Sequence, residues 1–187
     1  MDIYLIRHTR TAAEPGLCYG QSDIALADSF PEEARALQQK LPVLAENHKV
    51  FSSPLTRCLQ LAELISPKVS TDKRLLEIDF GAWENLRFDA IDADVLQHWT
   101  DNFVHVPPPN GESFSDLCRR ADHFWQDLLN HEAEQILIVT HAGIIRALLA
   151  QLLKLRPANA FQFRVDLGSV HKLQHLNNYT YINYLNL

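Results

Sequence analysis

Short, mostly apolar runs along the chain predict the strands of a central sheet. Positions 3–6, 49–52 and 136–139 are typical of buried strands, and the last is apolar throughout, as in a parallel sheet. Two later stretches, 161–167 and 179–187, are also expected to be extended. The strands are therefore spread over the whole chain.

Apolar positions at helical spacing predict helices between these strands. The expected helices run through positions 34–44, 55–62, 117–128 and 144–152. Ser53 and Pro54 are expected to be the N-cap and first residue of the second helix, and Ser113 the N-cap of the third. Because strands and helices alternate, we expect a three-layer α/β/α fold with a mostly parallel central sheet.

The remaining segments have weaker patterns. Residues 15–27 are rich in turn formers and predict a loop, whereas 75–80 is expected to be extended. We therefore expect a single domain over residues 1–187, with a variable insertion at about 80–112 that covers the substrate and is irregular or helical. Trp99 and Phe103 in this insertion are candidates to cover a base.

Composition narrows the class of protein. The 187 residues are 47% apolar and 21% charged, which suits one folded domain with a real core. The net charge of −6 gives no basic field for nucleic acid or an acidic membrane surface. The first residues do not form a signal peptide, and no apolar run is long enough to span a bilayer. We therefore expect a cytoplasmic protein with neither nucleic acid nor membrane as a partner.

Metal and disulfide chemistry find little support in the residue pattern. The three cysteines include no C-x-x-C pair, so free thiols are expected. His171 and His175 are four residues apart, which would suit a metal site on a helix. The stretch between them is expected to be extended, however, and lacks the H-E-x-x-H pattern. We therefore expect no metal.

Three predicted strand-to-helix junctions carry residues suited to chemistry. Arg7 and His8 follow the first strand, Arg57 lies in the first turn of the helix after the second, and His141 follows the strand at 136–139. Ligands in open α/β sheets bind at the carboxyl ends of the strands. We therefore expect the three junctions to converge on one site.

These residue types favour a phosphate ligand. Guanidinium groups match phosphate oxygens with paired hydrogen bonds, and helix N-termini near Pro54 and Gly143 add main-chain donors. Glycine at 143 would let the backbone approach an anion closely. A neutral imidazole is a nucleophile toward phosphorus, but the residues alone do not choose between His8 and His141.

An acid is also needed to protonate the departing alcohol. Glu77 lies within an apolar stretch, where partial burial would favour its protonated form. Glu84 and Asp79 are the alternatives nearby.

The same segments resemble the histidine phosphatase superfamily, also called the phosphoglycerate mutase-like family. The family's signature is an Arg-His pair after the first strand, which Arg7 and His8 match. The similarity extends in the family's order to residues 53–57, 76–84, 110–113 and 139–146. It spans nearly the whole chain and implies a phosphoglycerate mutase-like fold.

The resemblance also implies roles for individual residues. It implies that His8 becomes phosphorylated and that Arg7, Arg57 and His141 bind the transferring group. Glu77 would be the proton donor and would later activate water. No cofactor is implied.

Within the family, residues 18–26 are most similar to the α-ribazole-5′-phosphate phosphatases of the cobalamin pathway. Two positions depart from the family pattern, since Thr9 replaces the usual glycine and Glu14 replaces a frequent asparagine. An inward carboxylate would repel phosphate, so we expect Glu14 to face away and Thr11 or Gln21 to supply the neutral contact. Ala142, at the start of its predicted helix, is a further candidate phosphate contact.

The sequence thus predicts a phosphomonoesterase for a small phosphorylated metabolite, with α-ribazole 5′-phosphate as the specific expectation. The alternatives are a broad-specificity sugar or glycerate phosphatase, a phosphoglycerate mutase and a non-catalytic module that binds a phospho-ligand. The chain is short for a mutase, because the mutases it resembles carry additional segments. The presence of both histidines, both arginines and an acid argues against a binding module.

Overall fold

A six-stranded sheet forms the centre of the molecule in the computed structural model, which describes residues 1–187. The strands are β1 (Asp2–Arg7), β2 (His48–Ser52), β3 (Val69–Thr71), β4 (Gln135–Thr140), β5 (Val170–Leu176) and β6 (Tyr179–Tyr184). Their order is β3-β2-β4-β1-β5-β6, and the first four are parallel. Only β5 runs the other way, antiparallel to both β1 and β6. The predicted mostly parallel sheet is confirmed.

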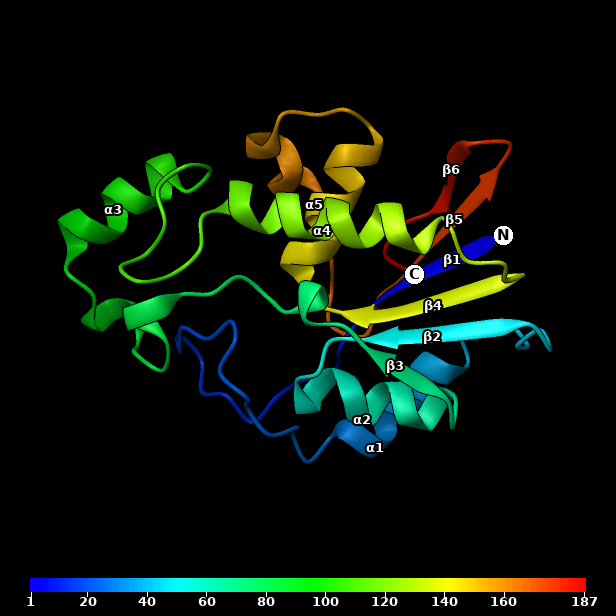
Figure 1. The fold of residues 1–187 in the computed structure, drawn as a ribbon. Coiled ribbons are helices and arrows are strands. Elements are labelled where there is room, and N and C mark those ends of the chain that lie inside the picture. The colour runs from blue at the N-terminus through cyan, green and yellow to red at the C-terminus, as the bar shows by residue number, and fades with distance from the viewer.

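Helices cover both faces of this sheet (Figure 1). They are α1 (Phe30–Gln38), α2 (Thr56–Ile65), α3 (Ala93–Asn102), α4 (Phe114–Leu128) and α5 (Ala142–Leu152). In Figure 1, α4 and α5 lie on one face and α1 and α2 on the other, while α3 lies apart, beyond the carboxyl ends of the strands. The expected three-layer α/β/α architecture is therefore present. None of the helices is both long and apolar enough to cross a membrane.

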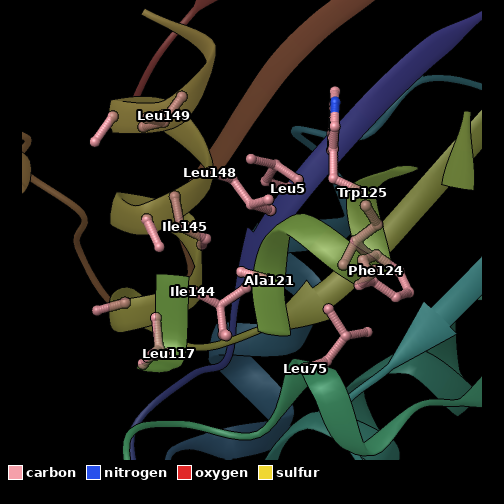
Figure 2. Close-up of a cluster of buried hydrophobic side chains, with 14 of the residues drawn as sticks. Leu5, Leu75, Leu117, Ala121, Phe124, Trp125, Ile144, Ile145, Leu148 and Leu149 are labelled. Carbon is pink, nitrogen blue, oxygen red and sulfur yellow. The ribbon is translucent and has the colours of Figure 1, made fainter. Parts of the chain in front are cut away.

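Alternating side chains of the central strands divide the core into two clusters. Ile3 and Leu5 of β1 point toward α4 and α5, whereas Tyr4 and Ile6 point toward α1 and α2. Figure 2 shows the first cluster, in which Leu5 lies among leucines, isoleucines and aromatic rings from α4 and α5. Burial of each large side chain contributes about 2 kcal/mol, so the two layers fix the central strands firmly.

The helix predicted through 117–128 is capped as expected. Ser113 caps α4: its hydroxyl accepts from the main-chain N–H of Asp116, whose carboxylate accepts from Ser113 in return. The N-cap prediction for Ser113 is confirmed.

Two predicted helix boundaries were wrong. The helix expected through 34–44 ends at Gln38, because Pro42 has no N–H and disfavours helical backbone before it. Leu41 and Leu44 still pack against the core from an irregular segment, which explains their helix-like spacing. The second helix begins at Thr56 rather than at Pro54, with Leu55 as its N-cap.

Two predicted extended segments also differ. Residues 75–80 do not form a strand, and the carbonyls of Leu76 and Glu77 accept hydrogen bonds from the Arg120 side chain instead of from a neighbouring strand. Residues 161–167 are also not a strand, since the turn at Pro157–Gln162 runs into a loop. The alternation of Phe161, Phe163 and Val165 therefore reflects side-chain packing from a loop rather than a strand.

Within residues 80–112, secondary structure is short and partly helical. It consists of the turns at Gly81–Trp83 and Phe88–Ala90 followed by α3. No residue of α3 is buried, and its aromatic contacts with the rest of the molecule run through Trp99. This segment thus stands over the carboxyl end of the sheet and touches the core only at its edge, where Phe103 packs against the first cluster.

Candidate active site

The three strand-to-helix junctions meet at the carboxyl ends of β1, β2 and β4. Adjacent parallel pairing places Arg7 opposite Thr140, which brings His8 and His141 together. Their ring centroids are 5.1 Å apart at an interplanar angle of 63°. Arg57 from α2 reaches the same point, with its Nε 3.3 Å from His141 Nδ1. His8, Arg57 and His141 are all buried, so these polar groups meet in a largely water-excluded place.

His8 is oriented by a main-chain oxygen. Its Nδ1 lies 2.7 Å from the carbonyl oxygen of Thr9, which only accepts, so Nδ1 carries the hydrogen and Nε2 bears the lone pair. Burial, and then the nearby charge of Arg57, lowers the pKa of His8 to about 3. The ring is therefore neutral at physiological pH, with Nε2 available as a nucleophile.

Both ring nitrogens of His141 are engaged. Nδ1 accepts from Arg57, which leaves the hydrogen on Nε2, 2.8 Å from the hydroxyl of Ser53. Burial and the proximity of His8 lower the pKa of His141 well below its usual value. In this arrangement His141 is a neutral donor, whereas His8 keeps a free lone pair. The geometry thus favours His8 over His141 as the nucleophile.

Arg57 joins the site to the loop at residues 15–27. Its Nη2 donates to the carbonyl of Gly20 at 2.5 Å and its Nη1 to that of Ser22 at 2.9 Å. The guanidinium carbon lies 5.3 Å from the centre of the Tyr19 ring. Three of its five N–H groups are thus used within the protein, the third by His141, which leaves two for a ligand.

Arg7 has a buried donor that could bind an anion. One Nη donates to the carbonyl of Val165 at 2.7 Å, but the buried Nε has no hydrogen-bond partner. The buried hydroxyl of Thr9, next to His8, also has no partner. Unpaired polar groups of this kind are rare in folded proteins. Two of them beside a free imidazole nitrogen are consistent with a ligand rich in oxygen.

Glu77 lies over the N-terminus of α5. Its Oε2 accepts from the main-chain N–H of Gly143 at 3.1 Å and its Oε1 from that of Ile78 at 3.0 Å. A Cβ at position 143 would lie 2.1 Å from Oε1. Glycine is therefore needed here because the Glu77 carboxylate approaches the backbone, whereas the sequence suggested the approach of a bound anion.

The alternative acids have other tasks. The carboxylate of Glu84 accepts from the main-chain N–H groups of Gly20, Gln21, Ser22 and Phe80. Burial alone would raise the pKa of Glu84, but these hydrogen bonds outweigh it and lower the pKa. Asp79 accepts from Gly81 in a local turn. Of the three acids, only Glu77 lines the cavity described below.

The neutral contacts expected from the loop already have partners. The hydroxyl of Thr11 lies 3.0 Å from that of Tyr19, and the amide of Gln21 donates to the carbonyl of Glu77. Both residues thus support the walls of the site, and their contact with phosphate stays a prediction. Glu14 is exposed, in agreement with the expectation that its carboxylate faces away.

The two helix N-termini differ in their availability. In α2, Asp23 accepts from both the N–H and the hydroxyl of Thr56, so a carboxylate already occupies this end. Asp23 thus takes one of the donors of this helix start, and the contact of this end with phosphate stays a prediction. In α5, Gly143 is used by Glu77, but Ala142 faces the cavity.

A cavity of about 240 Å³ adjoins these groups. Its walls are formed by Arg7, Tyr19, Glu77, Ile78, Phe80, Trp99, Phe103, Phe114, Leu117, Ala142, Gly143, Arg146 and Phe161. Six of the wall residues have aromatic rings, and Trp99 and Phe103 come from the segment expected to cover a base. The site therefore has a polar part around His8 and an aromatic part beside it.

Comparison with known proteins identifies the family. The family model of the histidine phosphatase superfamily (branch 1) matches residues 3–187. The chain belongs to this superfamily. Accordingly, it is a phosphomonoesterase, and phosphate esters are the substrates typical of the family.

Individual relatives carry several substrate names. The adenosylcobalamin/α-ribazole phosphatase of Escherichia coli K12 is 30% identical over 177 residues, which cover 90% of this chain and 87% of that protein. The crystal structure of the α-ribazole phosphatase from Shigella flexneri matches with a TM-score of 0.90 and 28% identity, covering 100% of this chain and 96% of the other. A mycobacterial glucosyl-3-phosphoglycerate phosphatase matches with a TM-score of 0.84 and 26% identity, covering 99% and 98%.

Several residues have roles at this histidine phosphatase site that the sequence did not predict. Ser53 contacts His141 across 88 positions, and the Glu84 carboxylate holds a loop more than sixty positions away. Arg120 donates to the carbonyls of Leu76 and Glu77 and so positions the candidate acid. These polar residues lie close to apolar stretches in the sequence, and polar groups that become buried must form hydrogen bonds. That proximity was the only indication that they have structural partners.

Proposed function

We propose that this enzyme hydrolyses a small phosphomonoester through a phosphohistidine on His8, with α-ribazole 5′-phosphate as its substrate. The observation that carries the proposal is the free Nε2 of His8, held neutral beside the unpaired Nε–H of Arg7. A nucleophile and an anion-binding group thus share one buried place, which is what phosphoryl transfer requires.

In the first step, Nε2 of His8 attacks phosphorus in line with the ester oxygen. The N–P bond forms, the P–O bond breaks, and Glu77 gives its proton to the departing alcohol oxygen. Positive charge develops on the ring and is stabilised by the Nδ1–H donated to the Thr9 carbonyl. Arg7, Arg57 and the start of α5 at Ala142 bind the equatorial oxygens, and His141 joins them by exchanging its Nε2–H hydrogen bond to Ser53 for one to phosphate. One such contact contributes about 3 kcal/mol to lowering the barrier.

In the second step, water replaces the alcohol. Glu77, now a carboxylate, accepts a proton from a water molecule whose oxygen attacks phosphorus. The N–P bond breaks, the electron pair returns to Nε2, and inorganic phosphate leaves. The enzyme is thereby restored to its starting protonation state.

The aromatic cavity supports a substrate with a flat ring. Its 240 Å³ volume and six aromatic wall residues match an unsaturated leaving group better than a small polar one. We propose that residues 80–112 form the variable substrate-covering insertion, since Phe80, Trp99 and Phe103 belong to it. Among the relatives, the α-ribazole phosphatases carry a substrate name with such a ring, which supports the cobalamin assignment.

A sugar or glycerate phosphatase is the second candidate. The structural match to a glucosyl-3-phosphoglycerate phosphatase favours it. A panel of ring-bearing nucleoside, sugar and glycerate phosphates, assayed for kcat/KM in excess chelator, separates the two. The proposal expects the highest value for α-ribazole 5′-phosphate. A higher value for glycerates would contradict the substrate assignment, and loss of all activity in chelator would contradict the mechanism.

A further inference from the structure

A third guanidinium group lies on the wall of the cavity. Arg146 is one helical turn beyond Ala142 on α5, which places both side chains on the same face. Its Nε donates to the carbonyl of Phe163 at 3.2 Å, and its guanidinium carbon lies 5.0 Å from the centre of the Phe161 ring. These contacts hold the half-buried head of Arg146 at the cavity and leave its four terminal N–H groups without a protein partner.

Arg146 also has no carboxylate within ion-pair distance. Six other arginines do form such pairs: Arg10, Arg74, Arg87, Arg119, Arg120 and Arg164. Of those without an acid partner, Arg35 and Arg156 are exposed to solvent. The others are Arg7, Arg57 and Arg146, all at the site. Arg146 therefore shares the property that distinguishes the two proposed phosphate-binding arginines.

The charge balance of the site leaves room for another negative group. Burial lowers the pKa of Arg146, and the nearby charge of Glu77 opposes this effect. In the mechanism proposed above, Glu77 is protonated when the phosphoryl group transfers. Three guanidinium charges then face one phosphate dianion, so one positive charge remains at the Arg146 end of the cavity.

We propose that Arg146 binds an oxygen acceptor on the leaving group and is a specificity-determining residue. The substrate class is then a phosphomonoester whose alcohol part joins an unsaturated ring to such an oxygen, a carboxylate being the strongest acceptor. This inference rests on the proposed function for the position of the phosphate. It adds a second recognition point, on an oxygen of the leaving group rather than on the phosphate.

Two matched probes test the proposal. 4-(Carboxymethyl)phenyl phosphate and 4-ethylphenyl phosphate differ in one carboxylate, and the methylene group insulates the ring so that the leaving groups stay similar. A hydrogen bond between charged groups favours the first probe by roughly 10- to 100-fold in kcat/KM for the wild type. In Arg146→Met, which keeps the apolar stem, the preference disappears while kcat/KM for 4-ethylphenyl phosphate stays within about 3-fold.

Other results would overturn the proposal. They are a wild type with no preference, or a preference that survives in Arg146→Met. A role exerted only through Glu77 would instead lower kcat for both probes alike and shift the pH profile of kcat. Arg156→Met is the matched control, since this exposed arginine lies outside the cavity and its loss leaves the preference intact.

A binding measurement separates this inference from the proposed function. If the wild type hydrolyses neither probe, the phosphohistidine mechanism is contradicted, and the inference about Arg146 is decided by calorimetry. The analogues are 4-(carboxymethyl)benzylphosphonate and 4-ethylbenzylphosphonate, which the enzyme does not cleave. Equal affinities in the wild type would overturn the role of Arg146, and tighter binding of the first that is lost in Arg146→Met supports it. If Arg146→Met does not fold, Arg146→Lys is used and is expected to keep only part of the preference.

Discussion

The phosphate-binding part of the site and the aromatic cavity beside it are built in different ways. Around His8, each side chain is held by main-chain oxygens or by another catalytic candidate, as when Arg57 bridges His141 and the carbonyls of Gly20 and Ser22. The cavity is instead formed largely by aromatic rings from turns, from the loop segments and from α3. One part is a polar network and the other is a packed apolar surface.

This difference separates chemistry from specificity. The network stands on the ends of β1 and β4, which are paired along their whole length and buried on both faces. The cavity depends on α3, which contributes no buried residue and is held through Trp99. Changes in the network should therefore alter the rate for every substrate, whereas changes in the cavity should alter the choice among substrates.

The largest effect is expected in the network, from His8→Ala. Removing the nucleophile should lower kcat for phenyl phosphate by about 10⁴-fold or more, because the lone pair of His141, the other imidazole at the site, is engaged by Arg57. Steady-state kinetics measure this loss, and a thermal unfolding curve confirms that the variant is folded. Unchanged kinetics in folded His8→Ala would remove His8 from the mechanism.

Glu77→Gln should give the next largest effect. Loss of the proton donor is expected to lower kcat by about 10²- to 10³-fold for alkyl phosphates, whose alcohols leave poorly without a proton. For 4-nitrophenyl phosphate, the first step needs little help, so the loss should be smaller. Measuring both substrates in the same variant tests the role directly. An equal loss for both would indicate that Glu77 positions the substrate and does not donate the proton.

In the cavity, Trp99→Ala should change selectivity. We expect kcat/KM to fall about tenfold for phenyl phosphate, because an aromatic wall contact is lost, and to change less than twofold for glycerol phosphate. Val95→Ala serves as the control, since Val95 lies on the same helix, is exposed and does not line the cavity. Equal losses of kcat/KM for both substrates in Trp99→Ala would contradict the view that the network determines the rate and the cavity determines specificity.

The buried, neutral state of His8 should also affect stability. The pKa of His8 is about 3 in the folded protein, below the ordinary value of about 6.5. As the pH falls below about 6.5, the unfolded chain therefore binds a proton at this residue that the folded chain does not bind. Stability is therefore present above pH 6.5 and is lost as the pH falls from there toward 3.

The pH-dependent loss of stability can be measured by comparing the wild type with His8→Asn. From pH 6.5 to 5, the free energy of unfolding of the wild type should fall on the order of 1–2 kcal/mol more than that of His8→Asn. Urea unfolding at both pH values measures the difference. Parallel losses in the two proteins would show that His8 is not held neutral by the fold.

The phosphate-binding network could be predicted from the sequence better than the cavity. Arg7, His8, Arg57 and His141 were predictable as a group because parallel strands end at one edge, and the structure brings them together there. The helix starts were less predictable, since capping depends on distant residues such as Asp23 at Thr56.

The cavity could be predicted only in outline. Trp99 and Phe103 belong to a segment that was expected to cover the substrate, but the ring of Phe161 reaches the same cavity from a turn near the other end of the chain. Contacts such as these depend on how irregular segments fold onto the core. The spacing of apolar residues along the sequence does not predict this arrangement. The requirement for Gly143 likewise became clear only when the Glu77 carboxylate was placed 2.1 Å from a would-be Cβ.

The most direct test of the mechanism is to trap the covalent intermediate. Wild type mixed briefly with a ³²P-labelled phosphomonoester and quenched in alkali should carry label that is stable to alkali and lost in acid, and peptide mapping should place it on His8. The same treatment of His8→Ala should leave no label. Acid-stable label, or alkali-stable label on His141, would contradict the assignment of His8 as the residue that carries the phosphoryl group.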